Sequence, residues 1–103
     1  MAELRWTPQA ADDLEAITEF IAKDSPNYAR LFATDVLAVL ERLSGFPFSG
    51  RVVPEMNDAA IREVILGNYR IIYRATDELV TVLAIHHGAR LLDPTVFEFL
   101  PDR

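Results

Sequence analysis

Two helix-start signals near the N-terminus constrain the fold of this chain more than any other feature. In Thr7-Pro8, and again in Ser25-Pro26, a hydroxyl residue that caps helices precedes a proline that fits the first helical turn. Each signal opens a stripe of apolar residues at helical spacing. The two stripes are Ala10, Leu14, Ile17, Ile21, and then Ala29, Phe32, Val36, Val39, Leu43. Because the segment between them is so short, we predict an antiparallel helical hairpin that ends at Gly45.

Four other segments have the alternation, or the β-branched and aromatic content, of strands. They are ELRW (3–6), IREVIL (61–66), YRIIYRA (69–75) and LVTVLAIHH (79–87). Gly67-Asn68 is typical of a two-residue hairpin turn, and Asp77-Glu78 is a second turn candidate. We therefore predict a single α+β domain over residues 1–103, with the order βααβββ and an antiparallel sheet backed by the α-helical hairpin. The place of the first strand in the sheet stays open.

The turns set a register, and the register divides the side chains between the two faces of the sheet. The expected cross-strand pairs are Leu66–Tyr69, Val64–Ile71, Glu63–Ile72, Ile71–Ala84 and Tyr73–Val82. One face is then almost entirely apolar, and we expect it to pack against the helical hairpin. The other face, which we call the mixed face, combines apolar and charged side chains. It carries Ile61, Glu63, Ile65, Arg70, Ile72, Arg74, Leu83, Ile85 and His87.

One helical hairpin covers one face of a sheet, so the mixed face needs another cover. The C-terminal tail, a second copy of the chain or a partner would serve. Exposed apolar surface of this size is typical of interaction sites. Glu63 is expected to lie diagonally between Arg70 and Arg74. One role for these residues is an ion-pair network centred on Glu63, and a second, compatible role is that the two arginines anchor acidic groups of a partner.

Charge and residue content argue against several kinds of site. The chain has 16 acidic and 10 basic residues, a net charge of −6, so we expect no direct binding of nucleic acid. It has no cysteine, and the adjacent His86 and His87 would point to opposite faces of a strand. We therefore expect no metal and no other cofactor. The N-terminus does not resemble a secretory signal and no apolar run is long enough to span a membrane, which predicts a cytoplasmic protein.

Five motifs occur in order along almost the whole chain. They are WTPQAADDLEAITEFIA (6–22), FPFSGR (46–51), IRE (61–63), YRIIYR (69–74) and VLAIHHGARLL (82–92). In this order they resemble the RelE/ParE superfamily of bacterial type II toxins, and its ParE branch in particular. The resemblance implies a toxin that inhibits DNA gyrase and is neutralised by a cognate ParD-like antitoxin. RelE-like members instead cleave messenger RNA on the ribosome, which is the alternative function.

A RelE-like ribonuclease would draw its catalytic residues from Arg62, Arg70, His87 and Arg90. The resemblance matches Arg70 to the arginine of a Tyr-Arg pair on the third strand, and Arg90 to an arginine after the last strand. In the expected register His87 lies diagonally near Arg70, where an imidazole can act as a general base. The chain departs from the ribonuclease pattern at Glu63, near the place of a lysine, and in a tail with neither tyrosine nor histidine. We therefore favour a toxin that acts by binding and has no catalytic residues.

The antitoxin is predicted to lie across the mixed face or along the adjacent edge of the sheet. The predicted contacts are Ile61, Ile65, Arg70, Ile72, Arg74, Leu83 and Ile85. Acidic residues crowd the first helix, where they face either solvent or a basic stretch of the partner. They are Asp12, Asp13, Glu15 and Glu19.

Overall fold

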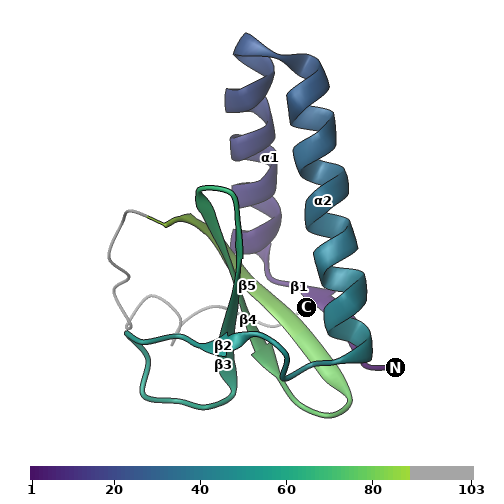
Figure 1. Cartoon of the computed structure of the whole chain (residues 1–103), viewed down its shortest axis with the longest axis vertical. Coiled ribbons are helices and arrows are strands. Elements are labelled where there is room, and N and C mark those ends of the chain that lie inside the picture. Colours follow the sequence, from purple (N-terminus) through teal and green to yellow (C-terminus); the bar gives the residue numbers. More distant parts are fainter. Residues whose placement is uncertain (89–103) are drawn as a thin grey trace.

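A computed structural model describes residues 1–88 (Figure 1), so Arg90 and the tail lie outside the described residues. The elements are β1 (Glu3–Trp6), α1 (Pro8–Asp24), α2 (Pro26–Gly45), β2 (Arg51–Val52), β3 (Ile61–Leu66), β4 (Tyr69–Ala75) and β5 (Leu79–His87). The two helices lie side by side and pack against one five-stranded sheet, which confirms the predicted α+β fold. The short strand β2 is an addition to the predicted order. Neither helix of residues 1–88 is long and apolar enough to cross a membrane.

The hairpin forms as the two start signals predict. The hydroxyl of Thr7 accepts a hydrogen bond from the backbone N–H of Ala10, and the hydroxyl of Ser25 accepts one from Tyr28. Ser25 also donates its own N–H to the carbonyl of Ile21, so a single residue ends α1 and starts α2. The predicted end of α2 is accurate to one residue, since Phe46 rather than Gly45 occupies the cap position.

The strand order in the sheet is β1-β5-β4-β3-β2, which settles where the first strand joins. β1 pairs with β5 in parallel, while the other pairings are antiparallel, so the sheet is mixed rather than wholly antiparallel. Backbone bonds from Glu3 to Glu78 and from Thr7 to Val82 hold β1 in place. The Thr7 hydroxyl continues this edge by donating to the carbonyl of Leu83.

The register between β3 and β4 is as predicted, including the turn at Gly67, which has a positive φ of 59°. The register between β4 and β5 is correct at Tyr73–Val82 but changes beyond that pair, because β5 bulges. Ile71 lies opposite Ile85, so the expected pair Ile71–Ala84 is wrong. A bulge adds one residue to one strand and reverses the faces of the residues that follow.

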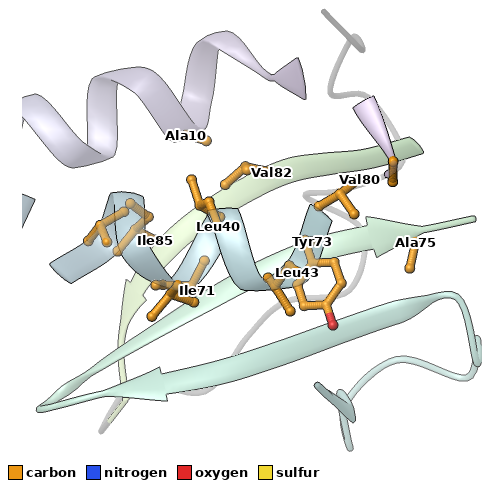
Figure 2. Packing of buried hydrophobic residues seen from close by; sticks show 12 residues of the cluster. Ala10, Leu40, Leu43, Ile71, Tyr73, Ala75, Val80, Val82 and Ile85 are labelled. Carbon is orange, nitrogen blue, oxygen red and sulfur yellow. The ribbon is translucent and has the colours of Figure 1, made fainter. Parts of the chain in front are cut away.

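Two clusters of buried apolar residues lie on the two faces of the sheet. The first fills the space between the helices and the sheet and includes Leu40, Tyr73 and Ile85 (Figure 2). The second lies on the opposite face, where Val53 and Met56, from the segment between β2 and β3, pack with residues of the sheet. Its remaining members are Ile61, Ile72, Leu83 and Ala84.

The prediction of an exposed apolar surface on the mixed face is therefore wrong for most of its residues. Ile61, Ile72 and Leu83 are at most 2% exposed, and Ile85 is buried on the helical side. Ile65 alone of the five isoleucine and leucine side chains expected there is well exposed, at 52%. A segment without regular secondary structure, rather than a partner, supplies apolar cover for this face in the isolated chain.

Gly50 tests how tightly another segment, the connection between α2 and β2, packs against the sheet. Its N–H donates to the hydroxyl of the fully buried Tyr73 at 2.9 Å, and a Cβ atom placed on it would lie 2.7 Å from the carbonyl oxygen of Glu63. Burial raises the pKa of Tyr73, while the bond from Gly50 lowers it.

We predict that Gly50→Ala lowers the free energy of unfolding by about 1–3 kcal/mol, since the backbone must shift to admit the methyl group. Urea denaturation followed by circular dichroism measures this. Gly45→Ala is the matched control, because no atom lies within 4 Å of the added carbon and its φ is not positive. Equal stability of the two variants would show that the segment yields without cost.

Candidate functional site

The centre of the mixed face is an ion-pair network built around a buried carboxylate. Glu63 on β3 is 1% exposed, and its Oε1 accepts a hydrogen bond from Nε of Arg70 on β4 at 2.5 Å. Its Oε2 accepts from Nε of Arg51 on β2. The two terminal nitrogens of Arg70 donate to the two carboxylate oxygens of Glu55, at 2.7 and 2.8 Å. The network joins β2, β3, β4 and the segment that covers them.

The charges of this network balance, since Glu63 and Glu55 face Arg70 and Arg51. The pKa of Arg70 is raised above the ordinary arginine value, mainly by its hydrogen bond with Glu55. Burial of the side chain lowers this pKa, whereas the bond with Glu63 raises it further. The guanidinium is thus a permanent cation whose fork is already filled by carboxylates. Two roles were considered for Arg70, a member of an ion-pair network and an anchor for a partner. Its contacts with Glu63 and Glu55 are those of the ion-pair network.

The predicted partners of Glu63 are partly wrong. Arg70 is one of them, but Arg51 takes the place expected for Arg74, which lies opposite Ile61 in the sheet. The reason is β2, which pairs Arg51 with Glu63 across the sheet edge. No sequence pattern indicated a strand of two residues.

His87 lies apart from Arg70, contrary to the expected register. The bulge places His87 opposite Tyr69, and the two rings are 5.5 Å apart in an edge-on arrangement. The ring of Tyr69 in turn lies 5.2 Å from that of Phe32 on α2, so His87 belongs to the helical side of the sheet. His86, not His87, lies opposite Arg70. The pairing of His87 with Arg70 on which a general base depends is therefore absent.

Arg62 points to the face opposite Arg70, because it alternates with Glu63 along β3. Its Nε donates to the carbonyl of Ala59 at 2.7 Å, and one terminal nitrogen donates to the carbonyls of Phe48 and Gly50, each at 3.1 Å. Its guanidinium lies 5.3 Å from the centre of the Phe48 ring. Arg62, Arg70 and His87 thus do not converge, and Arg90 lies outside the described residues.

The seven predicted antitoxin contacts divide by exposure. Ile65 and Arg74 are accessible on the surface of the isolated chain, whereas Ile61, Arg70, Ile72, Leu83 and Ile85 are buried. Contact with an antitoxin remains a prediction for all seven. Among residues 1–88, no group of three histidine, aspartate or glutamate side chains is placed to hold a metal ion.

An apolar cavity on the helical side was missed by the sequence predictions. It has a volume of about 380 Å³ and lies between the helical hairpin and the turn that joins β3 and β4. Its lining includes Ile21, Tyr28, Leu31, Phe32, Leu66 and Tyr69. Tyr28 and Leu31 are 69% and 50% exposed, although both are large and largely apolar. The available signal was that both residues lie off the buried stripe of α2.

Comparison with known proteins gives consistent matches. A family profile described as the ParE toxin of type II toxin-antitoxin system, parDE, matches residues 4–92. Toxin RelE2 of Caulobacter vibrioides is 36% identical over 92 residues, which cover 88% of this chain and 100% of that protein. A solved chain of the chromosomal ParDE TA system from P. aeruginosa shares the fold, with a TM-score of 0.68 and 23% identity over 84% of this chain and 96% of that one.

The network around Glu63 predicts a large effect on stability. Arg70→Met should lower the free energy of unfolding by about 3–5 kcal/mol, because it leaves a buried carboxylate short of a partner. Thermal and urea denaturation measure the loss. Arg5→Met is the control, since Arg5 pairs with Glu3 at the exposed end of β1 and such pairs contribute about 0–1 kcal/mol. Losses of similar size in the two variants would contradict a structural role for Arg70.

Proposed function

Since residues 4–92 match its profile, the chain belongs to the ParE toxin family of type II toxin-antitoxin systems, within the RelE/ParE superfamily, and we propose that it acts by binding a protein target rather than by cutting RNA. We further propose that this target is DNA gyrase, as the resemblance to ParE toxins implies, and that the protein acts in the cytoplasm. The alternative is a ribosome-dependent ribonuclease of the RelE type.

The observation that carries this proposal is the state of Arg70. A ribonuclease needs free cationic groups to hold the scissile phosphate and a base close to them. Here Arg70 is 6% exposed and its guanidinium is bonded to Glu63 and Glu55, while His87 lies on the other side of the sheet. The net charge of −6 opposes the approach of RNA as well. These features support a binding role.

We propose that a cognate ParD-like antitoxin binds the cavity between the hairpin and the β3–β4 turn. The exposed side chains of Tyr28 and Leu31 offer apolar anchors there, and the lining of the cavity is mainly apolar. Asp35 and Asn68 at its margin add polar groups that would orient the partner. An amphipathic helix laid into a groove is a common mode of such recognition. Ile65 and Arg74 remain candidates for a second contact on the other face of the sheet.

The choice between the two activities predicts a clear outcome in cells and in purified systems. Induction of the toxin should cause double-strand DNA breaks while protein synthesis continues, and purified toxin should inhibit supercoiling by gyrase. His87→Ala should keep this activity within about twofold, because the imidazole is not placed for catalysis. Cleavage of messenger RNA on purified ribosomes that His87→Ala abolishes would establish the ribonuclease instead.

The proposed antitoxin site predicts that Leu31→Glu weakens the toxin-antitoxin complex by at least about tenfold, since it places a carboxylate among apolar groups. Isothermal titration calorimetry with the purified antitoxin measures the change. Leu37→Glu is the matched control, because Leu37 is 57% exposed on the same helix and does not line the cavity. Unchanged affinity in Leu31→Glu would place the antitoxin elsewhere, with the surface around Ile65 and Arg74 as the next candidate.

A further inference from the structure

The connection between α2 and β3 exposes aromatic and apolar side chains beside arginines. Phe46 is 72% exposed, Phe48 43% and Val52 41%. We call the surface formed by Phe46, Phe48, Val52 and Arg62 the Phe-Arg patch. Arg62 connects two other members of the patch, because it donates to the carbonyl of Phe48, lies over the Phe48 ring and is the cross-strand neighbour of Val52. Exposed aromatic and arginine residues are the types that most often dominate protein interfaces.

The guanidinium of Arg62 is held in one orientation with donors to spare. Three bonds to backbone carbonyls use its Nε and one terminal nitrogen, and the Phe48 ring supports the planar group. Within residues 1–88, the second terminal nitrogen has no acceptor, and no carboxylate pairs with Arg62. A cation fixed in this way loses little freedom on binding, so it is well suited to receive a carboxylate.

The distribution of charge favours an acidic partner at this place. The acidic residues of α1 lie over the β5 side of the sheet, because α1 packs against β5. β2 occupies the opposite edge of the sheet, where the half-buried Arg62 on the neighbouring strand β3 has no carboxylate partner among residues 1–88. The acidic residues of α1 repel a negatively charged segment, whereas the arginine of the Phe-Arg patch attracts it.

The backbone of β2 adds a second means of recognition. Val53 donates its N–H to the carbonyl of Ile61, and Arg51 pairs with Glu63, so the N–H and C=O of Val52 between them point away from β3. An exposed strand edge accepts an extended segment through main-chain hydrogen bonds. In such a segment alternate side chains would point to the same side, which matches a patch where apolar and cationic groups lie next to one another.

We propose that the Phe-Arg patch binds an extended segment of the toxin's target protein in which acidic and aliphatic residues alternate. A carboxylate meets the open nitrogen of Arg62, and aliphatic side chains cover Phe46 and Phe48. This proposal depends on the proposed function in one respect, namely that the target of the toxin is a protein. The patch shares no residue with the lining of the cavity assigned to the antitoxin, so the two surfaces can be tested separately.

A peptide titration tests the surface without knowledge of the target. A short synthetic peptide that alternates Glu and Leu is titrated into the full-length protein, and the NMR shifts of the Gly50 amide and the Arg62 Nε–H are followed. We expect saturable shifts at these groups, and none with the matched peptide that carries Lys in place of Glu. Absence of shifts, or equal binding of the Lys peptide, would overturn the proposal. Stronger shifts with oligouridine at the same groups would also overturn it, in favour of nucleic acid.

Substitution of the exposed rings links the patch to the toxin's action. The double variant Phe46→Ser, Phe48→Ser should bind the Glu–Leu peptide at least about tenfold more weakly than the wild-type protein. It should also no longer inhibit gyrase, while its affinity for the antitoxin stays unchanged. Phe20→Ser is the control, because Phe20 is 65% exposed on α1, outside the patch. The single variant Phe48→Ser replaces the double variant if the double variant unfolds.

Full toxicity of a variant that no longer binds the peptide would refute the docking role. If the wild-type protein leaves gyrase untouched, the proposed function fails, and the peptide titration still decides the patch.

Discussion

The carboxylate of Glu63 is the group on which most of this arrangement depends. A glutamate that is 1% exposed is tolerable only when charged donors surround it, and here Arg70 and Arg51 do so. Those donors come from β4 and β2, and Arg70 in turn holds Glu55 on the covering segment. One buried charge therefore sets the position of the sheet edge and of the segment that covers the second apolar cluster. It also commits the guanidinium of Arg70 to carboxylates, which is the observation behind the proposed binding role.

Features decided by neighbouring residues could be predicted from the sequence. Thr7 and Ser25 start their helices because hydroxyl caps and following prolines act within one turn, and Gly67 supports a hairpin because it adopts a positive φ. The β3–β4 register follows from that turn. Features that depend on contacts between residues far apart in the sequence could not be predicted from it. The parallel pairing of β1 with β5 depends on how the helices return the chain to the sheet, and no local sequence pattern marks the bulge at Leu83.

In the candidate functional site, too, some features could be predicted from the sequence and others could not. The link between Glu63 and Arg70 could be predicted, because the two residues are close in a register set by one turn. The burial of Ile61, Ile72 and Leu83 could not, since the segment that packs over them has no periodicity to mark it as structural. Phe46 and Phe48 lie in the connection between α2 and β2, which is irregular as well. Segments without regular structure therefore account for both the main error, an exposed mixed face, and the surfaces that were overlooked.

The two bonds of the Thr7 hydroxyl have a consequence for the order in which the protein matures. That hydroxyl caps α1 next to it and also reaches Leu83, near the other end of the described chain. During synthesis the first strand leaves the ribosome long before the strand it pairs with, and contacts between residues so far apart in sequence form late. The helical hairpin can form early, but the sheet stays open at one side until β5 emerges. A bacterium that makes this toxin thus has an interval in each round of translation during which the growing chain is not yet complete enough to act.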